Sequence, residues 1–285
     1  QKCTFIFIPI LNPDGAYNYT RINANKIDLN RDAQDLSQPE SKILRDQFDT
    51  FKPHFCFNLH GQRSIYGAGA FNQSAVLSFL SPAENSERSI TDTRKKAMEI
   101  ISAINSTMQN VIPNNIGRYD DTYNQNCVGD TFQGLGVPTV LYESGHFSRD
   151  YSREKTREFV YLSLLTAMLY ISNNPISGKN YQSYFSIPQN EKCFYDLIIR
   201  NAKVKTGEEE KKTDIGILYQ ERLIDGKVDF IPRIEKIESL NGFYGHKEYD
   251  ASGSEVYDDR GQPIQVNSEN VFVMMNNEKI SLFSK

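Results

Sequence analysis

The chain has 285 residues, with 32 basic and 36 acidic side chains spread along it and a formal net charge of −4. This balance offers no basic surface for DNA or RNA, so we expect no nucleic-acid partner. No apolar run reaches the roughly 20 residues of a membrane-spanning helix, so we expect no membrane partner either. The length suits one large domain followed by a small one.

The N-terminal segment reads as a buried strand over residues 3–9, which begins almost at Gln1. We therefore expect that residues precede Gln1 in the intact protein, so that the sequence says nothing of a signal peptide. The cysteines form no Cys-x-x-Cys pair, and we expect reduced thiols and, from them, a cytoplasmic location. They are Cys3, Cys56, Cys127 and Cys193.

Residues 1–180 alternate apolar strands with helical periods, which predicts an α/β domain with a mixed, mostly parallel sheet and helices on both faces. Ser37 and Glu40 form a capping-box pattern before a helix that Pro53 ends. Apolar spacing predicts two further helices, over 97–108 and from about 153 to 171. The remaining predicted strands are 55–61 and 137–143.

Residues 181–285 have a different texture of short alternating runs, which predicts a small β-rich domain. The pair Asp225-Gly226 is a strong signal for a β-hairpin turn. Residues 206–213 are rich in charge and are expected to form an exposed loop. We find no catalytic motif in this domain, for which packing or control of substrate access is the default role. The predicted runs are 195–200, 214–219 and 228–231.

Polar signatures follow several apolar segments of the first domain, where ligands of open α/β sheets gather. They are 12–15 (Asn-Pro-Asp-Gly), His60-Gly61 and Glu143-Ser144-Gly145. Each alone has an ordinary explanation, since the first is usually a turn, a single histidine is usually structural, and a glutamate after a strand is often a helix cap. Their joint occurrence in one domain favours chemistry.

The stretch from Asn12 to Arg31 is the most specific part of the sequence. Its Asn-Pro-Asp-Gly turn is followed by Arg21 and then by Asp28-Leu-Asn-Arg31, and Asn58-Leu-His60 and Tyr142-Glu143 come later in the same order. This pattern resembles the zinc carboxypeptidases, the family of carboxypeptidase A-like metallopeptidases, over roughly residues 5–170. The resemblance implies a carboxypeptidase-like fold and a peptide substrate with a free carboxylate.

By this resemblance, Asn30 and Arg31 bind the terminal carboxylate of the substrate, for which a planar guanidinium is well suited. Arg21 stabilises the developing oxyanion as a fixed cation. The ordinary alternative for both arginines is a surface salt bridge. Tyr123 matches the mobile tyrosine that closes over the substrate, and Tyr119 is the competing choice.

The catalytic residues implied by the resemblance are His60 and Glu143. His60 matches the last of three zinc ligands, a role that suits a neutral imidazole. Glu143 matches the general base that takes a proton from the attacking water. Asp28 matches an acidic residue that orients the first zinc histidine.

The sequence departs from the family at the zinc site. The first two ligands of the family come from a His-x-x-Glu motif upstream of the turn, and none precedes Asn12 here. His54, His146 and His246 do not replace them convincingly. We therefore expect an N-terminally truncated domain that binds zinc weakly or not at all, with an exposed sheet edge through which copies of the chain can pair.

The leading hypothesis is that the parent protein is a zinc-dependent carboxypeptidase, which hydrolyses an amide bond next to a free carboxylate, and that this fragment is inactive. One alternative is an N-acyl amino acid deacylase of the succinylglutamate desuccinylase and aspartoacylase type. The other is a binding module that has kept the fold and lost the chemistry. The predicted domains are 1–180, catalytic, and 181–285, β-rich.

Overall fold

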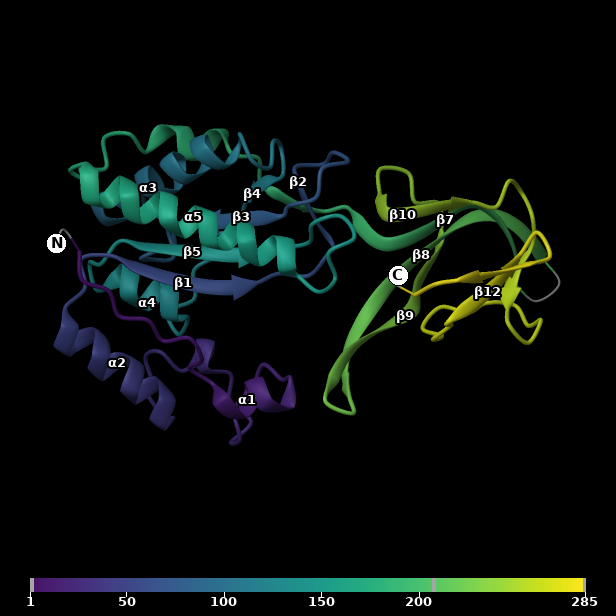
Figure 1. The fold of residues 1–285 in the computed structure, drawn as a ribbon, viewed down its shortest axis with the longest axis horizontal. Coiled ribbons are helices and arrows are strands. Elements are labelled where there is room, and N and C mark those ends of the chain that lie inside the picture. The colour runs from purple at the N-terminus through teal and green to yellow at the C-terminus, as the bar shows by residue number, and fades with distance from the viewer. Residues whose placement is uncertain (1–2, 207–208, 284–285) are drawn as a thin grey trace. The chain divides into compact units, whose positions relative to one another are not determined.

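The computed structural model describes residues 3–206 and 209–283 (Figure 1). The chain divides into two compact units. The first unit comprises Gln1–Gln62, Ala75–Gly145 and Arg153–Asn190, and the second comprises Arg63–Ser74, His146–Ser152 and Glu191–Lys285. Two short segments from the middle of the chain thus belong to the second unit, and the limit at residue 180 stays a prediction.

The first unit is built on a four-stranded sheet with the strand order β1-β5-β3-β4. Strands β1 and β5 run parallel, as do β3 and β4, whereas β3 and β5 run antiparallel. The predicted mixed α/β fold is therefore confirmed. The bounds are β1 (Cys56–Gly61), β3 (Leu77–Leu80), β4 (Ile116–Arg118) and β5 (Thr139–Ser144).

Helices cover both faces of this sheet, as Figure 1 illustrates. Leu141 lies beside Gly129 of α4, whereas the hydroxyl of the next residue, Tyr142, lies beside Ser163 of α5. Successive side chains of a strand point to opposite faces, so α4 and α5 lie on opposite sides. The helices are α1 (Pro13–Asn18), α2 (Pro39–Phe51), α3 (Asp92–Met108), α4 (Val128–Gly134) and α5 (Glu154–Asn173), with 3₁₀ turns η1 (Leu29–Arg31) and η2 (Gln182–Ser186).

Local sequence explains helix α3. The Thr91 hydroxyl accepts a hydrogen bond from the backbone N–H of Arg94 and so caps α3. Ala97, Ile100 and Ile104 are fully buried along one stripe of that helix, as their spacing predicts. The predicted helices over 97–108 and 153–171 are confirmed by α3 and α5.

The prediction of a buried strand over residues 3–9 is wrong. Residues 3–8 have no regular secondary structure, and the side chains of Phe5 and Phe7 are 49% and 70% exposed. A strand is stabilised by hydrogen bonds to a neighbour, and none of the described strands pairs with this segment. An apolar run alone therefore does not make a strand.

The capping-box prediction for α2 is also wrong. The helix is capped by Gln38, whose side chain makes no capping hydrogen bond. The Ser37 hydroxyl instead donates to the Asp32 carboxylate at 2.6 Å, and the backbone N–H groups of Ser37 and Gln38 donate to the same carboxylate. The Ser37 hydroxyl therefore forms a hydrogen bond with the buried Asp32 and does not cap the helix.

The second unit is β-rich, as predicted. Its main sheet has the order β10-β7-β8-β9, with antiparallel pairs except between β10 and β7. The predicted hairpin is confirmed, because Asp225 and Gly226 join β8 to β9 with φ values of 49° and 76°. The strands are β7 (Phe194–Thr206), β8 (Glu209–Ile224), β9 (Lys227–Glu238), β10 (Tyr244–Asp250), β11 (Val256–Asp258), β12 (Phe272–Met275) and β13 (Glu278–Ser281), with the short pair β2 (Tyr66–Ala68) and β6 (Asn190–Lys192).

The charged segment 206–213 is not the predicted loop. Residues 209–213 form the start of β8, which pairs with the end of β7 from Thr206 opposite Glu209 to Ala202 opposite Thr213. Residues 207 and 208 lie outside the described residues. Lys203 of β7 and Glu210 of β8 form an ion pair across the two strands. Among the described helices, none has the length and apolar character needed to cross a membrane.

Candidate functional site

The candidate site lies at the carboxyl ends of β1 and β5. The two strands are parallel, and their register places His60 directly opposite Glu143. Residues opposite each other on neighbouring strands point to the same face, which here is the face that α4 covers. The structure therefore brings together two residues that are 83 positions apart in the sequence. Their close approach was predicted from the strand ends together with the family resemblance.

Both side chains carry a buried polar atom that makes no hydrogen bond within the described residues: Nε2 of His60 and Oε2 of Glu143. Burial raises the pKa of the Glu143 carboxyl to about 7, and the positive charge of Arg21 opposes this rise. Burial also lowers the pKa of His60, helped by the charge of Arg21. Near neutral pH this pair is a neutral imidazole beside a carboxyl that can hold or release a proton.

Arg21 is held by the Asp28 carboxylate, which accepts a hydrogen bond from its Nε at 2.7 Å. The other carboxylate oxygen of Asp28 accepts from the backbone N–H of Asn30 and caps the η1 turn. Asp28 thus connects Arg21 to the η1 turn that carries Asn30 and Arg31. The Arg21 side chain is 62% exposed, so this ion pair contributes little to stability. The role of Asp28 toward a zinc histidine stays a prediction.

Asn30 and Arg31 contact the start of α4. The Asn30 side-chain oxygen accepts a hydrogen bond from the Val128 backbone N–H at 2.9 Å. The Arg31 guanidinium donates to the Asn30 carbonyl at 2.7 Å and to the Cys127 sulfur at 3.1 Å, and its charge reaches His60. Arg31 is exposed, so a ligand can reach it. Arg31 is therefore close enough to affect His60 electrostatically, and the substrate role of Asn30 and Arg31 stays a prediction.

The Asn-Pro-Asp-Gly signature folds as the start of α1. The Asn12 side-chain oxygen accepts from the Gly15 backbone N–H at 2.9 Å and caps this short helix. A Cβ on Gly15 would lie 2.7 Å from the Thr20 carbonyl oxygen, so the close chain approach here requires glycine. The signature thus has a structural role in shaping the loop that leads to Arg21.

Tyr119 and Tyr123 lie in the irregular segment between β4 and α4. The Tyr119 backbone N–H donates to the Phe79 carbonyl, which fixes its main chain beside β3. Tyr123 is half-buried. Its role as the residue that closes over a substrate stays a prediction.

The expected zinc can be tested against the donors that are present. The buried Nε2 of His60 and the lowered pKa of its ring suit one metal ligand. Within residues 3–206 and 209–283, however, no group of three His, Cys, Asp or Glu side chains could hold a metal ion. A catalytic zinc normally takes three protein ligands, so these residues do not supply a complete site. Among the residues that the structure describes, no two cysteines form a disulfide.

Three residues join the two strand ends. Gln62 and Arg153 were not singled out from the sequence, and Ser144 was noted only as part of the Glu143-Ser144-Gly145 signature. Arg153, which precedes α5, donates from Nη1 to the Ser144 carbonyl at 3.1 Å and from Nη2 to the Gln62 carbonyl at 3.2 Å. The Ser144 hydroxyl donates to the His60 carbonyl at 3.1 Å. No local pattern signals these contacts, because they join residues up to 91 positions apart. We call Gln62, Ser144 and Arg153 the strand-end clamp.

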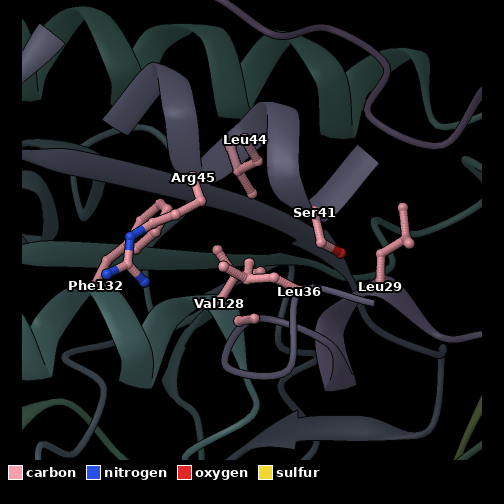
Figure 2. A pocket seen from close by; sticks show the side chains of 8 residues that line it. Leu29, Leu36, Ser41, Leu44, Arg45, Val128 and Phe132 are labelled. Carbon is pink, nitrogen blue, oxygen red and sulfur yellow. The ribbon is translucent and has the colours of Figure 1, made fainter. Parts of the chain in front are cut away.

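A small pocket lies elsewhere in the first unit, between α2, η1 and α4 (Figure 2). Its lining is mainly apolar, with Arg45 and Ser41 as the polar members. The predicted site residues are absent from its lining among the described residues, so it is not the candidate site. The lining residues are Leu29, Ala33, Leu36, Ser41, Leu44, Arg45, Val128 and Phe132.

Comparison with known proteins gives weak carboxypeptidase similarity. No family model matches the chain. Over 60 residues it is 30% identical to the probable carboxypeptidase 2 of Arthroderma benhamiae and to carboxypeptidase 2 of Trichophyton rubrum, a match that covers 21% of this chain and 11% of either relative. The matched part thus spans about a ninth of the length of these relatives.

Two solved structures match the chain at low identity and with low TM-scores. A metallo-carboxypeptidase from Burkholderia cenocepacia is 17% identical, with a TM-score of 0.42 over 57% of this chain and 43% of that one. The mDAP-bound form of Csd4, a D,L-carboxypeptidase of Helicobacter pylori, is 12% identical, with a TM-score of 0.37 over 97% of this chain and 69% of that one.

Proposed function

We propose that this chain is part of a zinc-dependent carboxypeptidase, which hydrolyses an amide bond next to a free carboxylate of a peptide. The observation that carries the proposal is the His60–Glu143 pair at the ends of two parallel strands. Each side chain has a buried polar atom with no hydrogen-bond partner in the described part of the chain. The 60-residue match to carboxypeptidase 2 supports the same class. The proposal that the metal is zinc rests on the resemblance to zinc carboxypeptidases, in which His60 would be one of the zinc ligands.

The chemistry of Glu143 supports its role as general base. A carboxyl with a pKa of about 7 is partly ionised at neutral pH and gains driving force for taking a proton from water. Arg21, whose charge acts on both Glu143 and His60, would stabilise negative charge that develops on the carbonyl oxygen. Asn30 and Arg31, in the η1 turn beside the start of α4, would bind the substrate carboxylate.

The test compares a free-acid peptide with its C-terminal amide on the full-length gene product, with zinc supplied and its content measured. Arg31→Ala is expected to raise KM about tenfold or more for the free acid and much less for the amide, because only the free acid loses a charged partner. Glu143→Gln is expected to lower kcat about 10²-fold or more while zinc content is unchanged. The exposed pair residue Glu158 on α5 gives the matched control Glu158→Gln.

Three results would contradict the proposal. Equal losses on the two substrates would show that Arg31 supports the fold and does not bind a carboxylate. Hydrolysis of N-acyl amino acids in preference to peptides would favour the deacylase. Peptide binding that persists without any turnover in full-length protein would favour the binding module.

A further inference from the structure

The ends of β1 and β5 carry an unusual concentration of hydrogen bonds within the first unit. The Gln62 backbone N–H donates to the Ser144 carbonyl at 2.9 Å, which extends the parallel pairing one residue beyond Gly61. Arg153 then donates to the carbonyls of Ser144 and Gln62, one from each strand. A parallel pair frays where its ladder ends, because the last groups have no further partner. The Arg153 guanidinium supplies a donor to the Gln62 carbonyl and a second donor to the Ser144 carbonyl, so it joins the two strand ends.

The Gln62 side chain is buried, and both its nitrogen and its oxygen form hydrogen bonds. Its Nε2 donates to the Ala75 carbonyl at 2.9 Å and to the Ser78 hydroxyl at 3.0 Å, and its Oε1 accepts from Asn190 at 2.8 Å. The Ser78 hydroxyl in turn donates to the Asn190 side-chain oxygen at 3.0 Å, which closes the network. A satisfied buried polar network fixes one geometry, since any shift leaves a group without its bond.

The tight packing around this network requires glycine at position 145. A Cβ there would lie 2.0 Å from the Ala75 carbonyl oxygen and 2.7 Å from Nε2 of Gln62. The Gly145 backbone N–H donates to the Val76 carbonyl at 2.9 Å. The chain that leaves β5 is therefore held against β3 immediately after Glu143 and Ser144.

From these contacts we infer that Arg153 is a positioning residue, which sets the separation of His60 and Glu143 by fixing the strand ends that carry them. It donates to the carbonyl one residue after Glu143 and to the carbonyl two residues after His60, so its proposed effect on catalysis acts through these two strand ends. The inference rests on the proposed function for its catalytic consequence. Its structural part stands on the hydrogen bonds alone.

The first experiment reads positioning without activity. Arg153→Met keeps most of the side-chain length and removes all the donors, so amide hydrogen exchange at Gly61, Gln62 and Gly145 is expected to rise at least about tenfold. Exchange in the core of α3 and the NMR signals of the second unit should stay unchanged. Arg157→Met is the matched control, because Arg157 lies one turn later on α5 and is 64% exposed.

The second experiment uses the full-length gene product and its peptide substrate. Arg153→Met is expected to lower kcat about 10- to 100-fold with KM within about twofold, as for other residues that orient a catalytic group. Arg153→Lys, which keeps a charged donor, should recover part of the loss. A residue that only stabilised the fold would change the amount of active protein and leave the kcat of the folded fraction unchanged.

The outcomes separate the two proposals. Unchanged exchange at the strand ends in Arg153→Met would overturn the positioning role. Raised exchange in a full-length protein that hydrolyses no peptide would support the clamp and overturn the proposed function. Raised exchange with an unchanged kcat would overturn the catalytic consequence of the clamp.

Discussion

Burial of the Asp130 carboxyl makes the stability of the folded chain depend on pH. Asp130 lies in the first turn of α4, is 8% exposed and accepts a hydrogen bond from the Asn124 backbone N–H. Burial raises its pKa to about 6 from the ordinary value of 3.8, although that hydrogen bond opposes the rise. The folded chain therefore holds a proton that the unfolded chain has released between these two pH values.

Because the folded pKa is the higher one, the stability contributed by protonated Asp130 is complete below about pH 4 and is lost as the pH rises to about 6. We expect Asp130→Asn, which stays neutral, to lack this decline. The difference in unfolding free energy between the two proteins should change by about 1–3 kcal/mol across that range. Urea unfolding at pH 4 and pH 7 measures it, and parallel pH curves for the two proteins would contradict the assignment.

At the same scale, sequence patterns identified residues whose role depends on a strand end or a short motif. His60 and Glu143 were identified from the family resemblance, and their places at the ends of apolar runs supported that assignment. Arg153 was not found, because its role consists of two backbone carbonyls that only the folded sheet brings together. Hydrogen bonds from a side chain to a distant main chain carry no sequence signature.

Among the elements, the β8–β9 hairpin depends on the backbone of two residues. Both Asp225 and Gly226 have positive φ, the geometry of a type I′ turn. A Cβ on Gly226 would meet no atom within 4 Å, so a substitution there tests the backbone alone. Gly226→Ala is expected to cost about 1 kcal/mol, because alanine tolerates this region poorly.

Asp225→Asn is the matched variant for the turn and is expected to be nearly neutral, since asparagine adopts the left-handed region readily. The measurement is the urea midpoint of both variants against the parent chain. An alanine variant as stable as the parent would mean that the turn does not require positive φ at residue 226. A matching loss in the asparagine variant would point to the lost carboxylate instead.

The elements also show where local pattern is insufficient. Helices α3 and α5 followed from apolar spacing because the hydrogen bonds of a helix are internal. Strands depend on partners, and this explains both errors in strand prediction. Residues 3–8 have strand composition but no described partner, whereas residues 209–213 look like a loop and are paired with β7.

For the whole molecule, the division into units does not follow the order of the chain. Tyr151, between β5 and α5, belongs to the second unit and donates a hydrogen bond at 2.9 Å to Asp196 of β7. Asp196 is 2% exposed, and its other carboxylate oxygen accepts from the Tyr219 backbone N–H at 2.8 Å. The Tyr151 ring also packs edge-on against Tyr219 and Phe230.

Tyr151→Phe keeps the ring and removes the donor, so a buried carboxylate loses one of its partners. We expect a loss of about 1–3 kcal/mol in the unfolding free energy of the second unit. Tyr161→Phe on α5 is the control, because Tyr161 is 61% exposed. The measurement is urea unfolding followed by the NMR signals of β7 and β8. If the two variants have the same urea midpoint, the hydroxyl of Tyr151 does not stabilise the position of its segment in the second unit.

The interleaved division has a consequence for the order of events during translation. Segment 63–74 leaves the ribosome early, yet the Ile65 carbonyl accepts its hydrogen bond from the N–H of Phe194, and the Ser64 carbonyl accepts from His246. At roughly 5–20 residues per second, the roughly 130 residues between Ile65 and Phe194 take on the order of ten seconds to synthesise. For that time the nascent chain carries segment 63–74 without these partners, directly after the strand that bears His60. A chaperone bound at the ribosome could therefore contact segment 63–74 before the strands that pair with it have been synthesised.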